Sequence, residues 1–150
     1  LSMASQGVET ASDLPGADRE LSFYGKESGW TGTSCTLRRY TLRLDGFVSI
    51  SAPMAGGELL TRPLRFTGSR LRLNFATSAV GSIRVELQRA DGRPIEGFTL
   101  ADCHDVYGDT VDRAVSWKGG QSLERFKGQA VRMRFVLKSA DLYALRVATT

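Results

Sequence analysis

The stretch RLRLNFATSAVGSIRVELQ (residues 70–88) decides the fold class. Apolar side chains alternate with arginine and asparagine over residues 71–75, and with charged or amide side chains over residues 83–88. A period of two residues puts the apolar side chains on one face, which is typical of a half-buried β-strand. We therefore predict two strands here, each with one face on the core.

The same alternation recurs on both sides of this stretch, over residues 40–44, 131–137 and 143–147. Asp-Gly pairs at 45–46 and 91–92 predict two-residue hairpin turns, the first of which would join residues 40–44 to a return strand over residues 47–50. Turn signals recur about every 8 to 12 residues, and no long helix is predicted beyond one turn near residues 122–126. These features predict an all-β fold: a two-sheet antiparallel β-sandwich of jelly-roll type with about nine or ten strands.

The composition fits one globular domain. The 150 residues are 41% hydrophobic and 24% charged, with 20 basic and 16 acidic side chains giving a net charge of +4. The excess is small and the basic residues lie among acidic ones along the chain, so we expect neither a nucleic-acid nor a membrane partner. Residues 1–18 have no apolar period and predict a linker or flexible arm, which leaves residues 19–150 as the β-sandwich domain. The two cysteines, Cys35 and Cys103, either form one disulfide or stay reduced as two small, buried apolar residues.

Polar and reactive side chains are concentrated in GFTLADCHDVYGDTVDRAVSW (residues 97–117). This stretch holds the single histidine of the chain, one cysteine, four aspartates, an arginine and a tryptophan. The strands around it carry ordinary alternation. A binding site, where the chain has one, is therefore expected in this stretch.

Aromatic side chains suit a sugar-binding surface, because their faces stack on the apolar faces of pyranose rings. Aromatic and polar side chains of this kind give the candidate carbohydrate-binding set: Trp30, Asp102, His104, Tyr107, Asp109, Arg113 and Trp117. Two of these residues have an alternative structural interpretation. Trp117 lies two residues after Val115 and would face the core with it. Arg113 lies two residues before Val115 and would be a buried arginine, which needs Asp102 or Asp109 as its partner.

Metal and catalytic chemistry have weaker support in the sequence. One histidine and two distant cysteines do not supply a zinc site, whereas Asp102, Asp105 and Asp109 are candidate calcium ligands in a loop. No nucleophile motif or phosphate-binding glycine loop is present, so no catalytic residue and no other cofactor is predicted. Two carboxylates of this loop could in principle form a glycosidase pair.

Several strings in register carry a family resemblance: residues 37–50 (LRRYTLRLDGFVSI), 56–66 (GGELLTRPLRF), 81–98 (GSIRVELQRADGRPIEGF), 113–120 (RAVSWKGG) and 131–147 (VRMRFVLKSADLYALRV). Over about residues 19 to 148, the chain resembles the C-terminal β-sandwich that follows the five-bladed β-propeller in bacterial glycoside-hydrolase-like proteins, similar to β-fructosidases and arabinanases. In that family the catalytic carboxylates belong to the propeller. The resemblance therefore implies an accessory module whose partner is a propeller domain or a glycan, in a secreted or periplasmic parent protein.

Three functions remain open at this point. The first is a non-catalytic accessory module of a carbohydrate-active enzyme, with a structural or weak carbohydrate-binding role. The second is a small stand-alone enzyme that acts on glycans with loop carboxylates. The third is a protein-interaction domain that associates through an edge strand or a basic sheet face.

Overall fold

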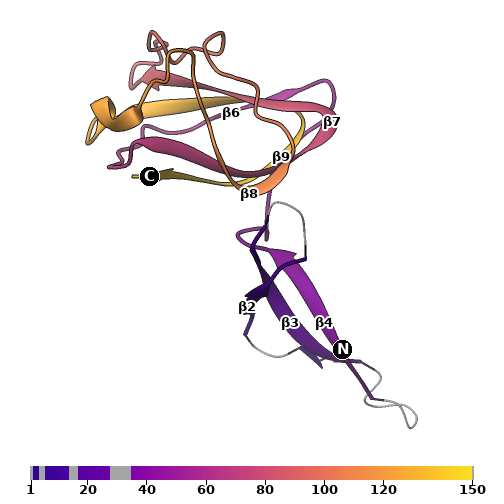
Figure 1. Cartoon of the computed structure of the whole chain (residues 1–150). Helices are drawn as coiled ribbons and strands as arrows, with labels where there is room; N and C mark the ends of the chain where they lie inside the picture. Colours follow the sequence, from indigo (N-terminus) through magenta and orange to yellow (C-terminus); the bar gives the residue numbers. More distant parts are fainter. Residues whose placement is uncertain (1, 4–5, 14–16, 28–34, 150) are drawn as a thin grey trace.

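A computed structural model describes residues 2–3, 6–13, 17–27 and 35–149 of the chain. The described residues form nine β-strands and one short 3-10 helix, arranged in two antiparallel sheets (Figure 1). The predicted all-β, two-sheet fold is confirmed. No helix among the described residues is long and apolar enough to cross a membrane.

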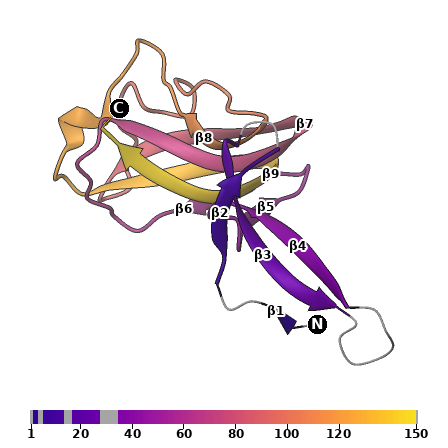
Figure 2. The same ribbon diagram turned by 60° about the horizontal axis from the view of Figure 1, so that its bottom comes forward.

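The first sheet contains β1 (Ser2–Met3), β2 (Val8–Ala11), β3 (Arg19–Glu27) and β4 (Thr36–Arg43). β3 is its centre and pairs with each of the other three strands. We call these four strands the arm, because they extend away from the rest of the molecule (Figure 2). β2 lies within the segment expected to be a linker, and its pairing with β3 was not indicated by any apolar period.

The second sheet contains the remaining strands: β5 (Ile50–Ala52), β6 (Gly57–Leu60), β7 (Arg70–Arg89), β8 (Asp109–Ala114) and β9 (Val131–Ala148). β7 and β9 pair along almost their whole lengths, with β8 on the far side of β7 and with β5 and β6 both on β9. The register shifts between Thr77 and Ser82, where the β7–β9 pair bends. The two predicted strands of residues 71–75 and 83–87 are thus the two halves of β7.

The core lies between the two halves of the bent β7–β9 pair. Inward-facing side chains from both halves of each strand belong to one buried cluster, together with residues of the loops that follow them. Its largest fully buried members are Trp117, Phe75, Phe98, Phe135, Leu71 and Leu73. The described core residues run from Ala52 to Leu142, so the arm contributes none of them.

One predicted hairpin is wrong. Asp45 has the positive φ, 53°, expected of the turn, but the chain does not fold back on β4. β4 already pairs with β3, and the next strand, β5, pairs with β9 in the other sheet. The turn therefore passes the chain from the arm to the second sheet.

The other two local predictions are confirmed. At Asp91–Gly92 the Arg89 N–H donates to the Arg93 carbonyl and closes a hairpin turn, although residues 90–92 form a loop of three residues in place of the predicted two. The short helix η1 (Leu123–Phe126) is capped by the Ser122 side chain, which accepts from the Glu124 N–H.

Candidate functional site

The loop that carries most candidate residues begins with a capped turn. Asp102 accepts hydrogen bonds from the Thr99 hydroxyl (2.7 Å) and the Thr99 backbone N–H (3.2 Å). These bonds favour the charged carboxylate and lower the pKa of Asp102 below its usual value. The Asp102 carbonyl also accepts from the Lys118 N–H, so this turn fixes both ends of the loop.

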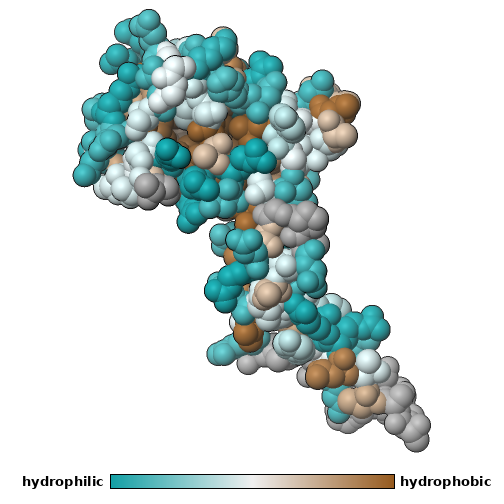
Figure 3. All heavy atoms as spheres, viewed as in Figure 1, coloured by the Kyte–Doolittle hydropathy of each residue, from teal (hydrophilic) through white to brown (hydrophobic). Residues whose placement is uncertain are grey.

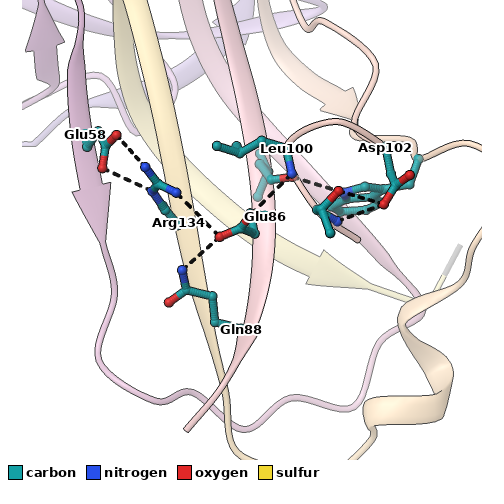
Figure 4. A network of polar contacts seen from close by, with 9 residues as sticks. Glu58, Glu86, Gln88, Leu100, Asp102 and Arg134 are labelled. Atoms are coloured by element: carbon teal, nitrogen blue, oxygen red, sulfur yellow. Dashed lines mark hydrogen bonds and ion pairs between the residues drawn. The ribbon is translucent and has the colours of Figure 1, made fainter. Parts of the chain in front are cut away.

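A buried carboxylate ties this turn to the sheet (Figure 4). Glu86 of β7, which is 5% exposed, accepts from the Gln88 side chain (2.8 Å) and the Leu100 backbone N–H (3.4 Å). The Arg134 guanidinium of β9 lies 3.6 Å from Glu86 and donates two hydrogen bonds to Glu58 of β6. A buried charge is tolerated when it is paired in this way. The network joins three strands to the loop and gives the candidate site a fixed base.

Trp117 and Cys103 face the core. Trp117 is 2% exposed, its Nε1–H donates to the Val85 carbonyl (3.0 Å), and its ring lies 5.1 Å from that of Phe98. The core alternative for Trp117 is thereby confirmed, and the ring offers no face to a sugar. Cys103 is buried opposite Trp117, and burial raises the pKa of its thiol. Cys35 is exposed, and both thiols are free.

Each remaining aspartate of the loop faces an arginine from another element. The pairs are Asp105 with Arg84 (2.5 Å), Asp109 with Arg43 (2.8 Å), and Asp112 with both Arg72 and Arg146 (2.6 Å each). The two guanidinium groups, that of Arg72 first, lower the pKa of Asp112. These contacts tie the loop and β8 to β4, β7 and β9, so the four loop aspartates have structural partners.

Arg113 does not have the buried position that its parity suggested. It is exposed, and neither Asp102 nor Asp109 is its partner. Arg113 pairs with Leu73 in regular register, but β8 has only β7 as a neighbour on the described sheet, and the side chain lies on its open side. The guanidinium is left facing solvent.

His104, Tyr107 and Arg113 line one shallow hollow of about 180 Å³. All three side chains are exposed, Tyr107 by 67%, and none of them has a hydrogen bond or ion pair with the residues that the structure describes. Asp105, which also lines the hollow, is neutralised by Arg84. The hollow therefore combines an aromatic face with an imidazole and a guanidinium that are free to bind.

The other predicted positions are not brought together. Asp102, Asp105 and Asp109 face different partners, and the described part of the chain contains no cluster of three or more His, Cys, Asp or Glu side chains that could hold a metal ion. The proposed calcium ligands therefore do not converge. Trp30 lies outside the described residues.

No family model, curated protein or solved structure matches this chain. The resemblance to the C-terminal β-sandwich of glycoside-hydrolase-like proteins has no support from these comparisons and stays a prediction.

The structure reveals a second group of polar residues, which the sequence did not bring together into one site. Arg72, Asn74 and Arg146 lie on the outer face of the β7–β9 pair, beside Asp112 of β8, where the arm meets the second sheet. Alternation identified their face of the strand. It did not identify the arm as the element that covers them.

Proposed function

We propose that this chain is a non-catalytic accessory β-sandwich module of a carbohydrate-active enzyme that binds glycan weakly through the His104–Tyr107–Arg113 hollow. The observation that carries the proposal is the exposed Tyr107 ring in a hollow, beside two polar side chains that have no partner in the described part of the chain. An aromatic face packs on the C–H face of a pyranose, while imidazole and guanidinium groups donate hydrogen bonds to its hydroxyls.

The size of the hollow argues for weak binding. Ligand pockets typically enclose about 300–1,000 Å³ and bury most of their ligand. At about 180 Å³, this hollow holds one edge of a sugar residue, and side chains on one face supply all contacts. Such a surface suits a polymer that is held at many points, with a dissociation constant in the millimolar range for short oligosaccharides.

The carboxylates favour binding over catalysis. A glycosidase needs one carboxylic acid that stays protonated, which requires a raised pKa, and a second carboxylate about 5 to 9.5 Å away. The pKa values of Asp102 and Asp112 are lowered, and Asp105 and Asp109 are paired with arginine. None of the four is placed as a general acid.

Affinity electrophoresis against a panel of soluble polysaccharides tests the proposal. We expect the wild-type chain to be retarded by one glycan class, and Tyr107→Ala to lose at least five-fold in affinity. Arg113→Ala should also weaken binding. Arg70 is an exposed strand arginine outside the hollow, so Arg70→Ala is the matched control and should leave the affinity unchanged. A panel without retardation, or retardation that Tyr107→Ala does not reduce, would contradict the proposal.

An interaction role is a second candidate, favoured by an exposed apolar strip. Phe47, Val48 and Ile50 are 68%, 76% and 45% exposed. Val48 and Ile50 also line an apolar groove of about 300 Å³ together with Leu59 and Tyr143. Such a strip suits contact with another protein surface. Figure 3 shows one face of the molecule, on which teal and white residues cover most of the coloured surface and brown residues form smaller groups.

A further inference from the structure

A cavity lies where the arm meets the second sheet. It encloses about 350 Å³, twice the hollow at Tyr107, and falls within the usual range of ligand sites. Its floor is formed by the first half of β7, the second half of β9 and β8. Its cover is the start of β3 and the Leu44–Asp45 turn. Figures 1 and 2 show the arm leaving the second sheet.

A buried amide in this cavity has an unused acceptor. Asn74 is 4% exposed, and its Nδ2 donates to the Leu44 carbonyl (2.6 Å), which fixes the orientation of the amide. Its Oδ1 is buried and has no hydrogen-bond partner among the residues that the structure describes. A buried oxygen without a hydrogen bond is unfavourable, because it has lost its water and gained no other donor. Asn74 lines the cavity, so a ligand hydroxyl that displaced the Leu44–Asp45 turn would give Oδ1 a hydrogen-bond donor.

The charges around the cavity are balanced. Arg72 and Arg146 share the single carboxylate of Asp112, so guanidinium N–H groups remain available as donors. Asp18 and Asp45 contribute acceptors from the cover. Because the cavity wall offers both positively charged donors and negatively charged acceptors, it suits a neutral ligand with several hydroxyl groups better than an anion.

Apolar side chains complete the wall. Leu44, Val111, Ala144 and Leu145 line the cavity between the polar groups. A monosaccharide presents the matching surface, with C–H groups on its ring faces and hydroxyl groups around its edge. The volume accommodates a ligand of that size and excludes a folded polymer chain.

We infer that this junction cavity is a binding site for a neutral, polyhydroxylated ligand of monosaccharide size, held by Asn74, Arg72, Arg146 and Asp112. The inference deepens the proposed function and rests on it for the class of ligand. It concerns a different surface, because none of the residues that line the Tyr107 hollow lines this cavity.

Saturation-transfer difference NMR on the full chain tests it, with glucose, galactose, xylose, arabinose and fructose as probes and acetate and sulfate as anionic comparisons. We expect at least one sugar to bind the wild-type chain. Val111→Phe, which fills the cavity without removing an ion pair, should reduce its signal at least five-fold. Arg146→Met, at a side chain that is 64% exposed, should do the same and decides the matter if Val111→Phe does not fold. Arg70→Ala is the control that should change nothing.

The outcomes separate the two sites. Sugar binding that is lost in Val111→Phe or Arg146→Met and kept in Tyr107→Ala supports the cavity, even where the polysaccharide panel shows no retardation. Sugar binding lost in Tyr107→Ala alone overturns the cavity and leaves the proposed function standing. Binding of the anions in place of the sugars, or of no probe at all, overturns the inference.

Discussion

Asp112 is the residue on which the outer face of the β7–β9 pair converges. Its carboxylate lies 2.6 Å from Arg72 and 2.6 Å from Arg146, which come from two different strands. Arg72 also donates to the Asp112 backbone carbonyl, so β8 is held to β7 by side chain and main chain together. One acidic side chain therefore fixes two cations that would otherwise repel each other.

Asp112→Asn should destabilise the fold by about 1–2 kcal/mol, because it weakens two charge-assisted hydrogen bonds at a partly exposed site. The pKa of Asp112 is lowered in the folded chain, so its contribution is complete above the pKa of an unfolded aspartate, about 3.9, and is lost as the pH falls through the lower folded pKa. Urea unfolding at pH 6 and at pH 3 measures both effects. The wild-type chain should lose more stability than Asp112→Asn over this interval, with exposed Asp13→Asn as the control; equal losses would contradict the ion-pair account.

At the scale of elements, the bend in β7 and β9 makes one pair of strands into two layers. Gly81 lies at this bend, and a Cβ atom there would come within 2.3 Å of the Ser139 carbonyl oxygen and 2.8 Å of the Lys138 carbonyl oxygen. Ser139 itself has a φ of 42°, which few non-glycine residues adopt. The close approach of the two backbones thus requires glycine at position 81.

Gly81→Ala should lower the free energy of unfolding by about 1–3 kcal/mol, because backbone atoms cannot move away as a flexible side chain would. The midpoint of urea denaturation reports this loss. Ser78→Ala, an exposed position in the same bend, should stay within about 0.5 kcal/mol of the wild type. A Gly81→Ala midpoint equal to that of Ser78→Ala would show that the bend tolerates a side chain.

The sequence predicts strands better than it predicts their partners. Period-two alternation located both halves of β7, most of β9 and the inward position of Trp117. A strand with one buried face needs an apolar residue at every second position, and this pattern is visible in the local sequence. Residues 76–82 have no such pattern, so their part in a continuous strand was not predictable. The aspartates of the loop were found as a cluster, but their arginines come from up to 66 residues away, and only the folded topology brings them together.

At the scale of the whole molecule, the arm and the second sheet meet through few contacts. The Arg43 guanidinium binds Asp109 and the Phe75 carbonyl, and Asn74 binds the Leu44 carbonyl. The arm contributes nothing to the described core. Small sheets without a core are marginal on their own, so further contacts of the arm and the neighbouring apolar strip would stabilise the chain.

Contact between copies of the chain is one way to cover that strip, and light scattering as a function of concentration measures it. If the strip mediates association, the wild-type mass should rise with concentration, and Val48→Glu should keep the chain monomeric. Val80→Glu, which is 63% exposed at another place, should behave as the wild type. A wild-type chain that stays monomeric up to millimolar concentration would exclude this form of the interaction role.

The proposed function has two parts: the chain binds carbohydrate, and it does not cleave it. The most direct measurement is a ¹H–¹⁵N NMR titration of the full chain with the best-retained glycan, followed by analysis of the glycan for cleavage products. The account predicts shifts at His104, Tyr107 and Arg113, with added shifts in the Asn74 side chain for a monosaccharide, and an intact glycan. An unperturbed spectrum across the panel, or released sugar, would contradict it.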